Sequence, residues 1–174
     1  AGIFFIYKAA GAAAEQGANF EEVIRIAEKT KDNVRTMGVA LSPCIIPEVG
    51  KASFSIGEDE MEIGMGIHGE PGIRREQLRS SDEVVDEIMK KILTDLDPIA
   101  GDEVSVLVNG LGGTPMEELY IIYRRIAQIL KERNVSVFHV YCGEFATSME
   151  MIGFSISLCK LDDELKSLLA TAAY

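Results

Sequence analysis

A glycine-rich stretch around His68 is the part of the sequence best suited to chemistry. The stretch EIGMGIHGEPG covers residues 62–72 and holds four glycines, with Pro71 shortly after the histidine. Glycine lets a ligand approach a neighbouring side chain closely, and proline reduces the entropy lost in holding a turn. A neutral imidazole can act as a general base, a metal ligand or a nucleophile toward an electrophilic carbonyl. From the residues alone, this functional interpretation has about the same support as the structural alternative. In that alternative, His68 is a turn histidine that caps local backbone groups.

The glycine spacing of this stretch also matches the dinucleotide-binding fingerprint, but its context does not. The pattern Gly64-x-Gly66-x-x-Gly69 would need a helix beginning at the loop, so that helical N–H groups meet a pyrophosphate. Pro71 and Gly72 instead keep the chain in a turn. A nucleotide site of this kind is therefore not expected here.

A second glycine loop, NGLGG at residues 109–113, lies between an expected strand and an expected helix. It lacks the Gly-Lys-Ser/Thr ending of a P-loop. The helix N-terminus behind it could receive an anion, but a tight strand-to-helix turn is the favoured interpretation.

Two further polar residues have open roles. His139 lies in VSVFHVY, where a structural histidine on a strand is favoured, and no second histidine lies at zinc-ligand spacing. No metal site is therefore expected. Glu70 either orients the ring of His68 or simply keeps an exposed turn soluble.

The bulk composition excludes several classes of protein. The 174 residues carry 28 acidic and 17 basic side chains, a net charge of −11, and no basic cluster, so no nucleic-acid surface is expected. No apolar run reaches membrane-spanning length. Three cysteines without a CxxC pair suggest small buried side chains in a reducing compartment, the cytoplasm. One domain over residues 1–174 is expected, and the apolar run GIFFIY at its start suggests contact with something upstream.

Hydrophobic periodicity and capping signals predict the elements. The expected helices are 3–16, a helix capped by Asn19 that ends at Lys31, 81–97 with Ser80 as N-cap, a helix from the capping box at Thr114 to Arg133, and 162–169. The expected strands are a short one within 38–50, then 52–56, 60–67, 103–109, 135–141 and 154–161. This order predicts an α+β domain, a mixed or antiparallel sheet with helices packed against it, whose strand order the sequence does not specify.

Two of the expected strands carry explicit face assignments. In the strand 60–67, the apolar face is expected to hold Met61, Ile63, Met65 and Ile67. In the strand 135–141, one face is expected to hold Val135, Val137, His139 and Tyr141. Both assignments rest on a strict alternation of side chains along a strand.

Several stretches together resemble the dihydroxyacetone kinase family, in its dihydroxyacetone-binding subunit or domain. MEIGMGIHGEPGI resembles the active-site segment of that family. YKAAGAAAEQGANFEEV, GVALSPCIIPEVGK, VLVNGLGGTPMEEL and GEFATSMEMIGFSISLCKLDDEL resemble it as well. The resemblance covers the whole chain but corresponds to the C-terminal half of the family's subunit.

The resemblance implies a covalent role for His68. In the family, the histidine of this segment forms a hemiaminal with the ketone carbon of dihydroxyacetone, and the neighbouring Gly66 and Gly69 clear a path for that ketone. Glycerol has no carbonyl and cannot form the bond, which gives selectivity through a missing interaction.

The resemblance also implies partners. Mg-ATP or ADP is expected on a separate nucleotide-binding kinase subunit or domain, no cofactor is expected on this chain, and the N-terminal half, absent here, is expected to supply the acid–base groups. The family's subunit is a homodimer. Two alternatives remain open: a non-catalytic co-activator paralogue that senses dihydroxyacetone, and a kinase for a related ketose such as erythrulose.

Overall fold

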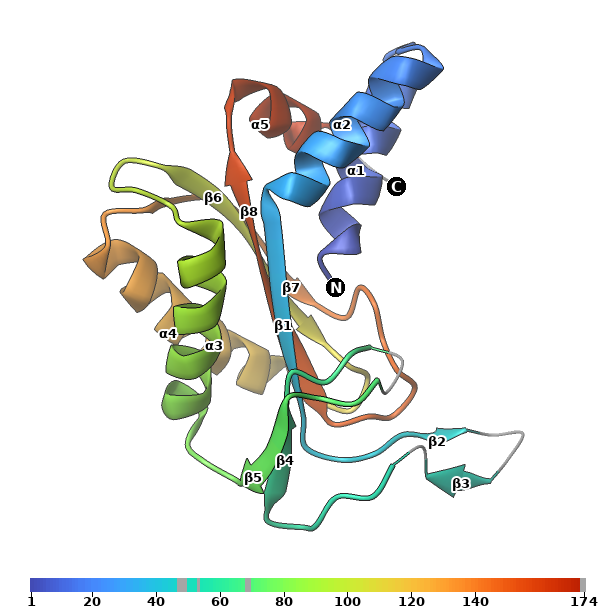
Figure 1. The fold of residues 1–174 in the computed structure, drawn as a ribbon, viewed down its shortest axis with the longest axis vertical. Helices are drawn as coiled ribbons and strands as arrows, with labels where there is room; N and C mark the ends of the chain where they lie inside the picture. The colour runs from blue at the N-terminus through green and yellow to red at the C-terminus, as the bar shows by residue number, and fades with distance from the viewer. Residues whose placement is uncertain (47–49, 53, 68–69, 173–174) are drawn as a thin grey trace.

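A six-stranded mixed β-sheet forms the centre of the described chain in this computed structural model (Figure 1). The structure describes residues 1–46, 50–52, 54–67 and 70–172. Neighbouring strands run antiparallel, except that β6 and β7 are parallel. In spatial order the strands are β5 (Arg74–Gln77), β4 (Glu60–Ile63), β1 (Val34–Ala40), β8 (Gly153–Leu161), β6 (Glu103–Gly110) and β7 (Ser136–Gly143). The predicted α+β class with a mixed sheet is confirmed.

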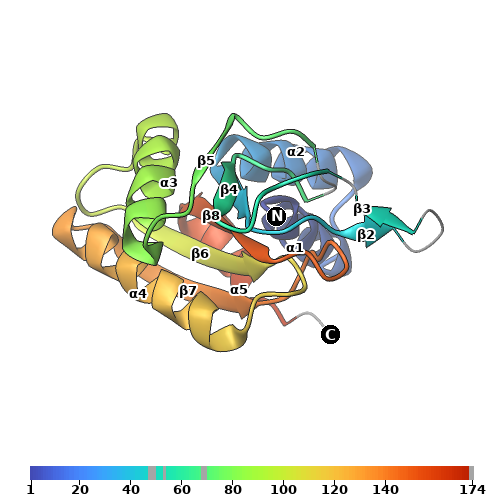
Figure 2. The ribbon, with the colours of Figure 1, turned by 90° about the horizontal axis from the view of Figure 1, so that it is seen from below.

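Five helices within the described residues cover the two faces of this sheet (Figure 2). They are α1 (Ile3–Glu15), α2 (Phe20–Asp32), α3 (Ser81–Leu96), α4 (Met116–Glu132) and α5 (Asp163–Ala170). On one face, α3 and α4 bury a core that joins Ile88 to Ile156 of β8. On the other face, α1, α2 and α5 bury a second core that joins Phe5 to Leu107 of β6. The sheet therefore separates two apolar cores.

Local capping chemistry explains where two of the helices begin. The side chain of Asn19 accepts a hydrogen bond of 2.9 Å from the backbone N–H of Glu22, which caps α2. At α3, Ser80 and Glu83 form a reciprocal capping box. Such caps satisfy N–H groups that have no partner within the helix. Both predicted helix starts are confirmed.

The predicted capping box at Thr114 is wrong. Helix α4 begins at Met116, and no side chain caps it. The buried hydroxyl of Thr114 instead donates to the carbonyl oxygen of Gly153 at 2.6 Å and accepts from the N–H of Gly153 at 2.9 Å. The hydroxyl that the local sequence predicts as a helix cap therefore bonds a distant residue, at the start of β8.

The predicted strand 60–67 ends early. Strand β4 stops at Ile63, because Gly64 adopts a φ of 85° and turns the chain away. Met61 and Ile63 join the core under α3, whereas Met65 packs in a separate small cluster. The prediction that these side chains share one strand face is therefore wrong beyond Ile63.

A β-bulge overturns the predicted alternation in β7. Val104 pairs with Val137, but the next residue of β6, Ser105, pairs with His139, so Phe138 is an extra residue. Val137 packs toward the core of α3 and α4, while Tyr141 packs toward that of α1 and α5. Val137 and Tyr141 do not share the face that was predicted for them.

The remaining strand predictions are mixed. Strands 103–109 and 154–161 are confirmed as β6 and β8. Strand β1 begins at Val34, before the predicted strand. Among the described residues of the predicted strand 52–56, only Ala52 lies in a strand: β3 (Lys51–Ala52) pairs with β2 (Ile45–Ile46) in a ribbon that projects from the body (Figures 1 and 2).

Two of the three cysteines fit the prediction of small buried side chains. Cys44 and Cys159 are buried, and Cys142 is half-buried. Burial, together with the nearby charge of Asp162, raises the pKa of Cys159 to about 12, so its reactive thiolate form is disfavoured. Within the described residues, no helix is long and apolar enough to cross a bilayer.

Candidate functional site

The loop between β4 and β5 carries the residues that the sequence singles out. The N–H of Ile73 donates to the carbonyl oxygen of Ile63 at 2.7 Å and closes the loop at its base. The N–H of Gly64 donates to the carbonyl oxygen of Gly38 on β1, also at 2.7 Å. These two bonds attach the base of the loop to the sheet.

A buried carboxylate braces the returning end of this loop. Glu62 lies on β4 and is 8% exposed. Its Oε1 accepts the N–H of Gly72 at 2.7 Å, and its Oε2 lies 3.0 Å from the guanidinium of Arg75. Burial acts to raise the pKa of Glu62, but the bonds from Gly72 and Arg75 outweigh it and hold the pKa below its usual value. Glu62 therefore stays charged at neutral pH.

Three glycines around the loop allow parts of the chain to approach one another closely. A Cβ added to Gly38 would lie 2.6 Å from the carbonyl oxygen of Met65, and one added to Gly72 would lie 2.5 Å from that of Ile63. A Cβ added to Gly66 would overlap the carboxylate of Glu70. Gly66 also donates its N–H to the carbonyl oxygen of Glu70 at 3.2 Å. These glycines therefore serve the packing of the loop on itself and on β1.

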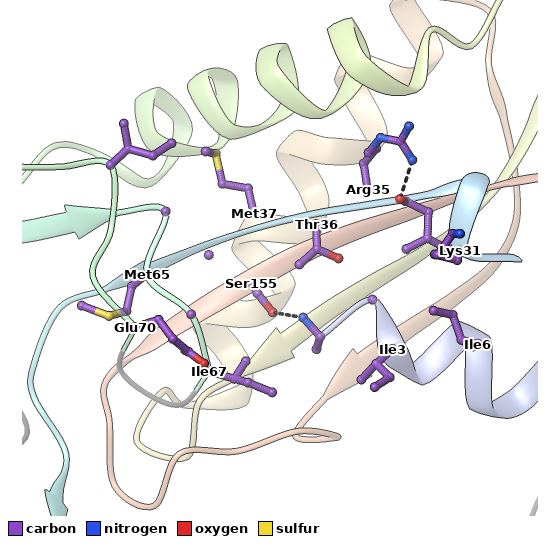
Figure 3. Close-up of a pocket in the computed structure, with 17 residues that line it drawn as sticks. Ile3, Ile6, Lys31, Arg35, Thr36, Met37, Met65, Ile67, Glu70 and Ser155 are labelled. Atoms are coloured by element: carbon purple, nitrogen blue, oxygen red, sulfur yellow. Dashed lines mark hydrogen bonds between the residues drawn. The ribbon is translucent and has the colours of Figure 1, made fainter. Parts of the chain in front are cut away.

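A cleft of about 620 Å³ lies beside the loop. Figure 3 shows Met65, Ile67 and Glu70 of the loop on one side of the cleft and the first turn of α1 on the other. Thr36 of β1 and Ser155 of β8 lie on the sheet between them. Clefts of this size accommodate small ligands.

The cleft combines apolar walls with a few polar groups. Its apolar lining comes from Ile3, Ile6, Met37, Met65, Ile67 and Ile73. The hydroxyl of Thr36 donates to Ser157 at 2.7 Å, and Ser155 is 2% exposed. Among the described lining residues, Glu70 is the one carboxylate. The hydroxyls can bind polar ligand atoms, and the side chains of Lys31 and Arg35 add positive charge to the lining.

The structure brings some of the predicted site residues together. Gly66 and Glu70 both line the cleft. His68 and Gly69 lie outside the described residues, so their roles remain predictions. His139 is exposed on β7, far along the chain from the loop, and its ring lies 4.4 Å from that of Tyr141. No group of three or more metal-ligating side chains occurs in the part of the chain that the structure describes.

The backbone of the NGLGG loop is occupied by structural contacts. The N–H of Gly113 donates to the carbonyl oxygen of Met151 at 3.0 Å, and the carbonyl oxygen of Leu111 accepts the N–H of Ser148 at 2.8 Å. The side chain of Asn109 bonds the backbone of residues 145–146 three times. These contacts favour the interpretation of NGLGG as a structural turn.

Sequence reasoning missed Glu62 and Gly38. Glu62 lies within the predicted strand 60–67, and no role is predicted for it there. A charged residue between two buried apolar positions, Met61 and Ile63, is the signal that could have found it, because charges are seldom buried without partners. For Gly38 no local signal exists, since its neighbour Met65 is distant in sequence.

Comparison with known proteins identifies relatives over the whole chain. The family model described as the Dak1 domain matches residues 1–174. The chain is 51% identical over 171 residues to the PTS-dependent dihydroxyacetone kinase 2, dihydroxyacetone-binding subunit DhaK, of Listeria innocua, covering 98% of this chain and 52% of that protein. It is 39% identical over 170 residues to an L-erythrulose kinase of Pectobacterium atrosepticum, covering 95% of this chain and 29% of that protein.

Solved structures agree with the fold. The dihydroxyacetone kinase operon co-activator DhaQ superposes with a TM-score of 0.89 at 33% identity, covering 97% of this chain and 52% of that one. The dihydroxyacetone kinase of C. freundii in complex with AMP-PNP and Mg²⁺ superposes with a TM-score of 0.88 at 33% identity, covering 99% and 32%. The chain spans about half the length of the first of these curated relatives, and less of the kinases.

Proposed function

Because the chain belongs to the Dak1 domain family, we propose that it is the substrate-binding part of a dihydroxyacetone kinase. The observation that carries this proposal is the 51% identity to a dihydroxyacetone-binding subunit over 98% of the chain. The β4–β5 loop, which contains the family-like stretch GIHGEPG, is attached to the sheet beside a cleft, and this supports the proposal.

The proposed chemistry is covalent capture of the ketone by His68. A ring nitrogen of the neutral imidazole adds to the carbonyl carbon of dihydroxyacetone and forms a C–N bond. The carbonyl π bond breaks, its oxygen gains a proton to become a hydroxyl, and the imidazole loses its N–H proton, so charge and atoms balance. Gly66 and Gly69 are proposed to lie beside the captured ketone. No metal takes part in this step.

Phosphoryl transfer is proposed to require other polypeptide. A nucleotide-binding kinase subunit or domain would hold Mg-ATP or ADP, and the half of the subunit upstream of this chain would supply acid–base groups. The described cleft has a single carboxylate, Glu70, which supports this division of labour. A homodimeric, cytoplasmic subunit, phosphorylated through ATP or the phosphotransferase system, is part of the same proposal.

Two alternatives have specific support. The similarity to the co-activator DhaQ favours a ketone sensor without catalysis, and the similarity to an L-erythrulose kinase favours a four-carbon ketose as substrate. The histidine within its complete glycine setting favours an enzyme over a sensor. Competition between dihydroxyacetone and erythrulose for the protein would rank the two ketoses.

The test is carbon NMR with dihydroxyacetone labelled at the carbonyl carbon. We expect the wild-type protein, with the upstream half supplied, to move the carbonyl signal to a tetrahedral-carbon position. His68→Ala should leave the free ketone signal. His139→Ala is the matched control, because it removes the chain's other imidazole from an exposed strand position.

Each outcome decides the anchor role. An adduct with wild type and His139→Ala, but not with His68→Ala, would support it. A free ketone signal with all three proteins, each folded by circular dichroism, would reject covalent capture and favour the co-activator alternative. An adduct that survives in His68→Ala would place the nucleophile elsewhere.

A further inference from the structure

We propose that Glu62 is a positioning residue that fixes the β4–β5 loop against the cleft. The inference deepens the proposed function and rests on it only for the ligand. Its structural part, the bracing of the loop, stands on the geometry of Glu62, Gly72 and Arg75.

Glu62 holds the returning end of the loop, just inside the backbone bonds that close its base. The bonds Ile73–Ile63 and Gly64–Gly38 fix the two residues at the base. Gly72 lies just inside the loop from Ile73, and its N–H is directed to Glu62 Oε1 at 2.7 Å. A charged acceptor strengthens such a bond, and low exposure protects it from water. The returning segment from Glu70 to Gly72 is therefore tied to β4.

The chemistry of the site calls for a carboxylate. Two donors, the N–H of Gly72 and the guanidinium of Arg75, approach the two oxygens separately. A glutamine could still accept from Gly72 through its one oxygen but would then turn its NH₂ group toward Arg75. An alanine would lose both bonds. Removing Arg75, whose side chain is 42% exposed, would leave the bond to Gly72 in place.

Loop position matters because a covalent anchor must meet its carbonyl within a narrow range of distances. Misplacement by about 1 Å can reduce a reaction by roughly a hundredfold. We therefore expect dihydroxyacetone capture to weaken about tenfold or more in Glu62→Ala, less in Glu62→Gln, and least in Arg75→Ala.

The matched control is Glu60→Ala. Glu60 lies on the same strand and also accepts a glycine N–H, that of Gly57, at 2.9 Å, but it braces the turn before β4 and not the loop after it. The two alanine variants thus compare the loss of a carboxylate at the start of β4 with the loss of one near its end. Gly72→Ala is a second perturbation, because its Cβ would press on Ile63 and Glu62 and displace the loop without removing the carboxylate.

Two measurements are made on the full chain with its upstream half. The first is amide hydrogen exchange at Gly66 and Gly72, which reports loop fixing without any ligand. The second is the ketone concentration that gives half-maximal adduct by carbon NMR. We expect Glu62→Ala to speed exchange at both glycines and weaken capture, Glu62→Gln to cause smaller changes in the same directions, and Glu60→Ala to change neither.

Unchanged exchange in Glu62→Ala would overturn the proposal, and so would faster exchange with unaltered capture. If Glu62→Ala does not fold, Glu62→Gln and Gly72→Ala decide by the same two readouts. If the wild type forms no adduct, the proposed function fails, while the exchange rates alone still support or overturn the bracing role of Glu62.

Discussion

Single glycines in this chain differ in what they permit. Gly112 has a φ of 121°, and a Cβ there would overlap the carbonyl oxygen of Met149, because the NGLGG loop lies against the segment before β8. Gly11 lies on the exposed side of α1, where an added Cβ meets nothing within 4 Å. The same residue type is thus required at one position and dispensable at the other.

Alanine at these two glycines should change stability in opposite directions. We expect Gly112→Ala to lower the free energy of unfolding by about 2–4 kcal/mol, because both sterics and backbone conformation oppose it. Gly11→Ala should raise it by about 0.5–1 kcal/mol, since alanine loses less backbone freedom in a helix. Urea denaturation measures both changes. Equal changes in the two variants would contradict the packing described at Gly112.

At the residue scale, the sequence predicts features that depend on neighbouring residues. It misses features that depend on a partner brought near only by folding. The glycine setting of His68 is visible in the sequence, because it lies in consecutive residues. The role of Glu62 is not, because its partners Gly72 and Arg75 are brought near only when β5 returns along β4. A partner ten or more residues away cannot be assigned from spacing alone.

At the scale of elements, helix starts were predictable where the capping partner lies three residues away. Ser80 and Glu83 form the expected box, whereas the hydroxyl of Thr114 bonds Gly153 and α4 begins without a side-chain cap. The same rule applies to strands: β6 and β8 follow from composition, but the bulge at Phe138 depends on pairing with β6. Long-range partners override local signals.

Thr114→Val should therefore cost more than loss of a true helix cap. Valine keeps the shape but leaves the buried N–H and carbonyl of Gly153 without the hydroxyl, for an expected loss of about 1–3 kcal/mol. Ser80→Ala removes an exposed cap and should cost about 1 kcal/mol. Thermal unfolding of both variants gives the comparison, and a smaller loss for Thr114→Val than for Ser80→Ala would contradict the role of the bonds to Gly153.

At the scale of the whole molecule, acid should unfold the protein through its paired carboxylates. The bond from Arg74 holds the pKa of Glu87 below its usual value, and the bond from Lys160 does the same for Asp102. A carboxylate with a lowered folded pKa stabilises the fold above its unfolded pKa, about 4, and loses this contribution as the pH falls through the folded pKa.

The urea midpoint should accordingly change little between pH 7 and pH 5 and decrease steadily below about pH 4.5. Glu87→Gln should lower the midpoint at pH 7 and flatten the decrease, because it removes one of the titrating groups. Glu58→Gln, at an exposed turn residue, is the control. A midpoint at pH 3 equal to that at pH 7 would contradict the role of these ion pairs.

The position of β8 sets a condition on how the chain can be made. It is the last along the sequence of the strands that the structure describes, yet it separates β1 from β6 at the middle of the sheet. Thr36 and Ser157, which share a hydrogen bond, lie 121 residues apart. A nascent chain therefore leaves the ribosome with β1 and β6 synthesised and their facing edges open. Such edges invite aggregation, so the growing polypeptide is most vulnerable until β8 emerges and joins them.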